Sequence, residues 1–475
     1  MRPPKHSALL SDHAHTKLVL DLSPNDIQTP FTRLPLEKRR AAATPSGRVP
    51  KDPPQTDEHN DTLTFPSPIV IRNDALDLDP KAPAQSLRSW VQEKDRNPVT
   101  PARNVLYVAA PPEITPDVSP MRDWLVPSVK GARGRELAPP STEHIRDYLA
   151  AFYHGLEVRT FPRPFRWVAW DGNKVGRSRK AWTPSYVGLA VDDECVGVRC
   201  RANAADDGLF HRQLNLGDML DALLEVVPAD AYAIVLLTNH DTYEDDEDDF
   251  CAGRAFGQSR IAVVSSFRYN PAIDDLMGGS DASHVWPASH CWQYVGWLRN
   301  RIPRKYHPFR NEISADTPGA MPAAVKAASA CGVGDEAGLW LSRVCKTASH
   351  ELGHCFALDH CVYYSCIMQS TSCLEEDDRQ PPFLCPVCLP KLTSAVLMSK
   401  PGADKEAEQA YVLRRYGALR EFCLAWPDAA IFTGFAAWNP ASVSASGRLA
   451  PGWRNSRLYR CPVTGSMGFL ANVLE

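Results

Sequence analysis

The sequence predicts an α/β fold, because helical and strand-like segments alternate through its middle. Apolar residues recur every three or four positions over residues 215–227, as on one face of a helix, and Pro228 follows. Residues 232–237 then form a continuous apolar run, which is typical of a strand buried on both faces of a parallel sheet. This order predicts a sheet covered by helices.

Further elements are expected on both sides of this unit. Ser141 begins a helix whose apolar positions continue to about Gly155. The acidic run over residues 244–249 is interpreted as a loop, since it lacks the spaced ligands and central glycine of a calcium site. Strands are predicted at residues 156–161, 186–191 and 260–267, with a basic loop at 172–180.

Composition divides the chain into regions. Residues 1–85 are rich in proline and polar residues and are predicted to be a disordered arm. An insertion with three tryptophans is expected near 272–334, packed at the rim of a cleft. The remaining divisions are a connecting segment without a clear assignment at 86–140, a catalytic domain at 141–400, and a C-terminal helix (407–423) with an extension at 401–475.

Charge and cysteine content restrict the class of protein. The chain has 475 residues, 44% of them hydrophobic, and a net charge of −4, so we expect a sizeable core and no nucleic-acid partner. No apolar run approaches the length of a membrane span, and no secretory signal is evident. We therefore expect a cytoplasmic or nuclear protein without a membrane partner, whose 14 cysteines serve as metal ligands more readily than as disulfides. Its oligomeric state is left open.

A helix that begins at Asp335 carries the motif His350-Glu351-x-x-His354. Residues four apart lie on one face of a helix, so the two imidazoles can hold one metal ion. Glu351 projects beside that ion, where it can serve as the general base and then the general acid of a hydrolysis. Two helical histidines without a metal are the alternative for a bare motif of this kind.

A third imidazole, from His360, completes a catalytic zinc site only if the helix ends soon after His354. Glycine usually makes such a turn, but this chain has Ala357 there. Alanine in left-handed geometry costs roughly 1 kcal/mol. We therefore expect a slightly strained or re-routed turn that keeps the ligand.

Four cysteines after these histidines have the spacing of a structural zinc site: Cys361, Cys366, Cys385 and Cys388. The alternatives are a disulfide or plain packing. Cys355 and Cys373 are interpreted as buried free thiols. Because Cys361 follows His360 directly, the structural ion should fix the backbone that presents the third imidazole. The cofactor prediction is thus two Zn²⁺ per chain.

This stretch resembles the archaemetzincin signature, H-E-x-x-H-x-x-G-x-x-H-C-x4-C-x-M followed by C-x-x-C, except at Ala357. The resemblance covers about residues 141–397. It implies a metzincin-like zincin fold with a mixed five-stranded sheet, a long active-site helix and a small C-terminal subdomain stabilised by the four-cysteine zinc. It also implies that Met368 forms a turn beneath the three histidines, and that short peptides are substrates of an aminopeptidase.

The predicted function is therefore a zinc metallopeptidase acting on a peptide or protein substrate. A zinc-stabilised binding or adaptor protein, and a zinc hydrolase of a non-peptide substrate, remain alternatives. Residues 260–267 are the candidate for a peptide-binding edge strand, with plain sheet core as the equal alternative. An aminopeptidase needs an acidic group for the substrate amine, and the sequence leaves it open among Asp335, Glu336, Asp359 and Glu375.

Overall fold

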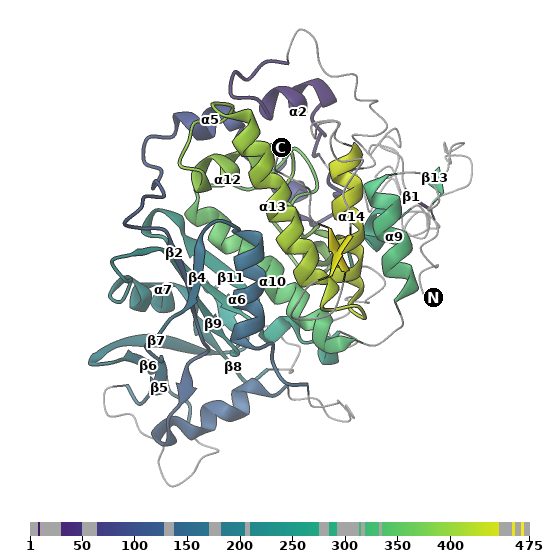
Figure 1. Cartoon of the computed structure of the whole chain (residues 1–475). Coiled ribbons are helices and arrows are strands. Elements are labelled where there is room, and N and C mark those ends of the chain that lie inside the picture. The colour runs from purple at the N-terminus through teal and green to yellow at the C-terminus, as the bar shows by residue number, and fades with distance from the viewer. Residues whose placement is uncertain are drawn as a thin grey trace.

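Two large sheets, two two-stranded sheets and a set of helices make up the described part of the mixed α/β fold, so the predicted fold class is confirmed at that level (Figure 1). The computed structural model describes residues 30–49, 64–127, 137–170, 182–204, 210–274, 285–291, 319–331 and 335–445, and four short strands: β1 (Ala8–Leu9), β13 (Ile313–Ser314), β14 (Leu458–Arg460) and β15 (Met467–Phe469). The predicted loop at 172–180 lies outside the described residues.

The first sheet has five strands in the order β11-β12-β9-β2-β4. Strand β9 pairs in parallel with β12 on one side and β2 on the other, and β2 pairs in parallel with β4. Only β11, at the edge, runs antiparallel to its neighbour. The strands are β11 (Gly253–Phe256), β12 (Ile261–Ser265), β9 (Ala231–Thr238), β2 (Val105–Ala109) and β4 (Glu157–Thr160).

Successive side chains of each strand point to opposite faces of this sheet, and each face contributes to a separate hydrophobic core. One face packs against the helices α6 (Thr142–Phe152) and α10 (Glu336–Cys355), and the other packs against α7 (Leu216–Leu224) (Figure 1). All eight residues of β9 are buried, as predicted for a central parallel strand. The first face carries Leu106, Val108, Val235, Leu237, Ala262 and Val264, and the second carries Val105, Tyr107, Ile234, Leu236, Ile261 and Val263.

Of the two interpretations of residues 260–267, the edge strand is wrong and the sheet core is confirmed. Residues 260–267 become β12, which lies between β9 and β11 and is fully buried. The edge of the sheet is β11, which follows the acidic loop directly. Its four residues, with alternating partial exposure, are too few for a recognisable sequence period.

A second sheet of six strands, in the order β10-β8-β7-β6-β5-β3, was not predicted. It packs beside the α7 face of the first sheet through the second core. Only β6 in it matches a predicted strand. Its strands are β10 (Thr242–Tyr243), β8 (Arg212–Asn215), β7 (Glu194–Ala202), β6 (Tyr186–Val191), β5 (Arg166–Val168) and β3 (Glu113–Ile114), with the 3-10 helix η1 (Pro116–Leu125) beside β3.

Helices surround α10 on the side away from the sheet (Figure 1). The predicted helix at 407–423 is α13 (Lys405–Leu424), whereas α14 (Ala430–Ala445) was not predicted because its sequence mixes apolar residues all round. The other helices are α2 (Leu36–Ala42), α4 (Ala75–Leu78), α5 (Leu87–Gln92), α9 (Ala320–Ala330), α11 (Leu374–Arg379) and α12 (Cys388–Val396).

The N-terminal region departs from the prediction of a disordered arm over its described residues. Val70 and Leu76 are buried in the main core, and Asp74 forms a buried ion pair with Arg379. Arg379 lies about 300 positions from Asp74 in the chain, so no local sequence pattern could predict this contact. Residues 86–140, left unassigned from sequence, supply the interior strand β2, between β9 and β4.

The insertion is also placed differently from the prediction. Trp286 is 1% exposed and packs edge-on against Phe383 and Phe435, so it lies in the main core and not at a rim. Trp292 and Trp297 lie outside the described residues.

Helix α10 ends in a left-handed turn at Ala357, whose φ is 56°. The amide of Leu358 donates to the Gly353 carbonyl at 3.2 Å, and the amide of Ala357 donates to the His354 carbonyl at 2.9 Å. This pair of bonds is the Schellman motif, in which the left-handed position is usually glycine. Ala357 therefore makes the break that the third histidine requires.

Side chains from the N-terminal half also bind this helix end. Tyr232 Oη donates to the Cys355 carbonyl at 2.9 Å, Trp90 Nε1 to that of Phe356 at 3.0 Å, and Gln85 Nε2 to that of Ala357 at 2.9 Å. Each satisfies a backbone carbonyl left without an intrahelical partner. The end of α10 is thus held by two segments distant in sequence, one around residues 85–90 and the other β9.

We predict that Ala357→Val lowers the free energy of unfolding by about 1–3 kcal/mol, because a β-branched side chain opposes the left-handed turn. Ala357→Gly should change it by less than about 1 kcal/mol, since the relief of strain is offset by unfolded-state entropy. Denaturant unfolding of the two variants and the parent provides the measurement. Equal stability of the valine variant and the parent would contradict the strained turn.

Candidate functional site

Three imidazoles meet at the end of α10. His350 and His354 lie one turn apart on the helix, and His360 follows the turn at Ala357. Their ring centroids are 4.8, 4.9 and 5.3 Å apart, and one ring nitrogen of each lies within 4.8 Å of the others.

The tautomers of the two helical histidines follow from their hydrogen bonds. His350 Nδ1 lies 2.6 Å from the Ile367 carbonyl, and His354 Nδ1 lies 2.7 Å from the Leu358 carbonyl. Each Nδ1 must therefore carry the hydrogen, which leaves a lone pair on each Nε2 of a neutral ring. Hydrogen bonds from Nδ1 to a backbone carbonyl are typical of metal-binding histidines.

The two Nε2 atoms are 3.0 Å apart. Neither has a hydrogen to donate, so their lone pairs repel unless a cation lies against both. Ligand nitrogens of a tetrahedral zinc are separated by about 3.4 Å, given Zn–N distances of about 2.0–2.1 Å. The donor set therefore fits zinc.

The pKa values of the three histidines also favour neutral rings with a free lone pair. Burial first, and a neighbouring imidazole second, lower the pKa of His350, His354 and His360 to about 3. At neutral pH all three are uncharged, which is the form that coordinates a metal.

Glu351 lies beside the imidazoles and is 7% exposed. A Cβ on Gly253, in the edge strand β11, would lie 2.9 Å from Glu351 Oε1, so glycine is needed there for the carboxylate to fit. Burial raises the pKa of Glu351 to about 8; Arg254 lowers that pKa and Glu244 raises it. A carboxyl group with this pKa can exchange a proton near neutral pH.

The four cysteines of the second set are also together. Their sulfurs lie within 4.8 Å of one another, and all four side chains are buried. Cys361 Sγ and Cys385 Sγ are 3.6 Å apart, much longer than the bond of about 2.05 Å in a disulfide. Sulfurs of a tetrahedral zinc are separated by about 3.8 Å.

Burial raises the pKa of Cys366 and Cys385 well above the usual value, whereas hydrogen bonds from the neighbouring thiols hold that of Cys361 well below it. Several thiolates so close together require a cation, and four sulfur ligands leave no position open. This set therefore suits a structural ion.

The chain between the two sets connects them directly. Cys361 follows His360, and its amide donates to the Met368 carbonyl at 2.7 Å. Met368 is fully buried, with its sulfur so close to Gly353 that a Cβ there would lie 2.5 Å away. Of the extra cysteines, Cys355 is buried as predicted, whereas the prediction for Cys373 is wrong, since it is exposed and lines the cleft.

A cleft of about 690 Å³ opens over the three histidines and Glu351. One wall is the edge strand β11, and another is the segment of residues 370–374 that follows Met368. Arg254, Gly253 and Glu93 also line it and were not singled out from sequence. No local sequence pattern marks them, because only the tertiary fold brings their segments next to the three histidines.

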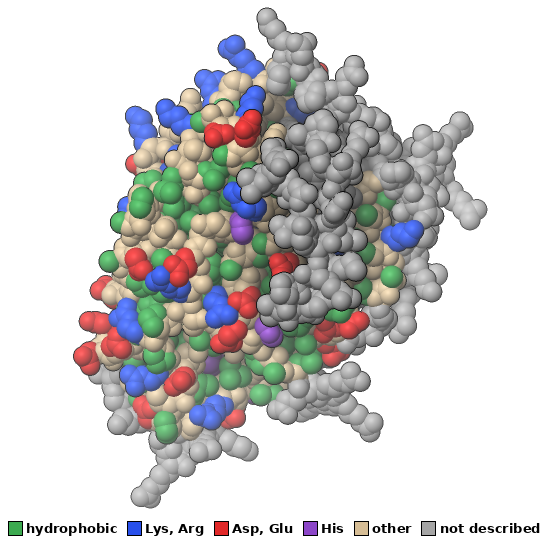
Figure 2. Space-filling model, viewed as in Figure 1, with side chains coloured by type: hydrophobic (Ala, Val, Ile, Leu, Met, Phe, Trp, Pro, Cys, Tyr) green, Lys and Arg blue, Asp and Glu red, His purple; other side chains and the backbone are tan. Residues whose placement is uncertain are grey.

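On the face shown in Figure 2, acidic and basic side chains of the described residues are interspersed. This face therefore has no large patch of one charge that would favour a strongly charged partner. None of the helices that the structure describes combines the length and apolar composition that a membrane span needs.

Comparisons with known proteins agree with the site. The family model described as Peptidase family M54 matches residues 331–394. Archaemetzincin-2 of Rattus norvegicus is 30% identical over 337 residues, which are 70% of this chain and 71% of that protein. Archaemetzincin-2 of Homo sapiens is 32% identical over 191 residues, 40% of this chain and 44% of that protein, so this match spans less than half of the human relative.

A crystal structure of archaemetzincin from Methanopyrus kandleri aligns with 62% of this chain and 97% of its own, at 19% identity and a TM-score of 0.28. Since that score is low, the assignment depends on the sequence relatives and on the ligand geometry above. The rat relative is 30% identical over 71% of its own length, and the segment that the family model matches contains all three histidines, Glu351 and the four cysteines. The chain belongs to the archaemetzincin family, peptidase family M54.

Proposed function

We propose that this chain is a zinc-dependent peptidase that holds two Zn²⁺, one at the three histidines and one at the four cysteines. The observation that carries the proposal is the 3.0 Å approach of two unprotonated Nε2 atoms beside a buried carboxyl group at the floor of a cleft. Zinc bound there would polarise the scissile carbonyl and acidify water.

Glu351 supplies the proton transfers. Its carboxylate takes a proton from the attacking water and passes it to the departing amine. Because its pKa is raised to about 8 by burial, the protonated form holds its proton long enough to serve as the acid. The neighbouring rings of His350, His354 and His360 stay neutral and hold the metal.

The arrangement further supports a metzincin-like organisation. The edge strand β11 lies along the cleft, where an extended peptide can pair with its free main-chain groups. Met368 lies buried beneath Gly353 of the metal-binding helix, as in a methionine turn, and the four cysteines stabilise the small subdomain that includes α12.

An aminopeptidase-like specificity is supported by Asp359. Of the four acidic residues left open by the sequence, it alone is among the described residues lining the cleft, and it directly precedes His360. Burial raises its pKa, which Lys391 lowers and Glu93 raises. Asp335 instead caps the far end of α10, next to Glu336.

Glu351→Gln should reduce kcat/KM for peptides by roughly 10²- to 10⁴-fold, since it removes the base and leaves the ligands in place. Elemental analysis should find two zinc ions in both the variant and the parent, and a mixed peptide library read by mass spectrometry reports cleavage. The parent treated with a chelator is the control for metal-dependent cuts. If neither protein cleaves any peptide, the peptidase function is refuted.

The acidic limb of the pH profile should respond to the two charges that face Glu351. The active form is the carboxylate, so activity falls as pH drops through its pKa. Arg254→Met removes a positive charge, raises the pKa and moves the limb to higher pH by up to about one unit; Glu244→Gln moves it to lower pH. Profiles of kcat/KM measure both. Shifts in the same direction would contradict the role of Glu351.

Asp359→Asn should raise KM about tenfold for peptides with a free N-terminus, because a charge-assisted contact to the amine is lost. N-acetylated peptides of the same sequence should be cleaved poorly by the parent and be unaffected by the change. Glu375→Gln, an exposed acidic site outside the cleft lining, is the matched control. Equal cleavage of free and acetylated peptides by the parent would exclude the aminopeptidase assignment.

A further inference from the structure

We propose that Gln380 is a positioning residue for the three-histidine site: its side-chain amide holds the backbone carbonyl that orients the ring of His350. The inference rests on the proposed function only in that the three histidines bind a metal ion.

The contacts converge on one carbonyl. Gln380 Nε2 donates to the carbonyls of Ile367 and Gln369, each at 2.7 Å. The Ile367 carbonyl also receives the hydrogen bond from His350 Nδ1 at 2.6 Å, and Gln380 Nε2 lies 3.5 Å from that same nitrogen. The two N–H groups of one amide thus hold the backbone on both sides of Met368.

The backbone of Gln380 is itself hydrogen-bonded to α10, the helix that carries His350. Lys346, one turn before His350, donates from Nζ to the Asp377 carbonyl at 2.6 Å and to the Gln380 carbonyl at 3.3 Å. Gln380 and Lys346 are 3% and 1% exposed. Since solvent does not compete for these bonds, they are strong and specific.

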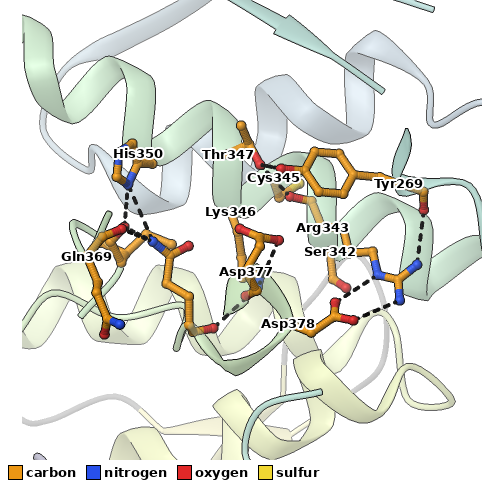
Figure 3. Close-up of polar contacts among 12 residues, drawn as sticks. Tyr269, Ser342, Arg343, Cys345, Lys346, Thr347, His350, Gln369, Asp377 and Asp378 are labelled. Carbon is orange, nitrogen blue, oxygen red and sulfur yellow. Dashed lines mark hydrogen bonds and ion pairs between the residues drawn. The ribbon is translucent and has the colours of Figure 1, made fainter. Parts of the chain in front are cut away.

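One turn earlier, Arg343 binds the same segment. Its guanidinium lies 3.2 Å from Asp378 Oδ1 and 2.9 Å from Asp274 Oδ1, and it is almost fully buried. Figure 3 shows Arg343, Lys346 and His350 projecting from one side of α10 toward the chain that carries Asp377 and Asp378. The residues are spaced i, i+3 and i+7, so they share one helix face.

The ring of His350 is therefore set from two directions. Its Cα is held in α10, and its Nδ1 is held by a carbonyl whose own position depends on Gln380, on a segment tied back to α10. This leaves Nε2 aimed at the Nε2 of His354. Partners of metal ligands that act in this way typically change metal affinity by 10- to 100-fold when they are removed.

The test uses the full chain with Gln380→Met, which keeps the length of the side chain without its donors, and with Gln380→Glu, which keeps its shape and places carboxylate oxygens against two carbonyls. Zn²⁺ affinity at each site is measured by competition with a metal-chelating dye. Both variants should bind one of the two ions 10- to 100-fold more weakly than the parent. The thiolate-to-metal absorption of Co²⁺-loaded protein should be unchanged, since the four cysteines keep their ion.

Gln213→Met is the matched control. Gln213 is also fully buried, and its Nε2 donates to Asp241 Oδ2 at 3.0 Å and to the Asp249 carbonyl at 2.7 Å, in and beside the six-stranded sheet. It should lose stability without losing affinity for either ion.

Two results would overturn the inference. Unchanged affinity for both ions in the Gln380 variants would show that the amide does not orient His350. Joint loss of both ions, or unfolding of both variants, would assign Gln380 a general structural role. A parent that binds both ions and cleaves no peptide would refute the proposed function and leave this inference standing, because cleavage is not the readout.

Discussion

The crowding of unprotonated ligand atoms at the end of α10 is the constraint on which the rest of the site depends. Two imidazole nitrogens lie 3.0 Å apart, and their lone pairs repel each other unless a cation lies between them. Four cysteine sulfurs lie within 4.8 Å of one another, and they cannot all ionise unless a cation neutralises the thiolates. The fold therefore holds two sets of donors close together at a cost in free energy that metal binding at each set would offset. Coordination is linked to folding, since neither set exists in the unfolded chain.

The two sets are joined by a short piece of backbone that cannot move independently. His360 belongs to one and Cys361 to the other, and the amide of Cys361 binds the carbonyl of Met368, which packs against Gly353 of α10. A closed four-cysteine site is rigid. An ion held there would therefore give His360 a fixed support at a point where helix geometry no longer does so.

Polar partners around α10 explain why so many charged residues are buried beside this helix. Arg343 and Lys346 are each paired with carboxylates or carbonyls of the segment after Met368. Such pairs add little net stability, because the free-energy cost of removing the charges from water is about as large as the attraction between them. What they provide is a unique placement of that segment, which forms one wall of the cleft and carries Gln380.

The errors of sequence interpretation have one physical origin. Residues 260–267 resemble an exposed or a buried strand equally well until the neighbours are known, and β11 is too short to show a period. Likewise, Gln85 and Trp90 are hydrogen-bonded to the end of α10, about 270 positions away. Contacts of that separation leave no local pattern in the chain.

The sequence by itself determined the ligand types, their order and the helix that presents them, because an i, i+4 pair of histidines and closely spaced cysteines are local geometry. It also marked Ala357 as the turn, whose φ of 56° follows from the need to bring His360 back. Only the tertiary structure decided which strand borders the cleft, which charges shift the pKa of Glu351 and which amide binds the carbonyl that His350 contacts. Those depend on long-range packing, where burial and hydrogen-bond partners come from elements far apart in the chain.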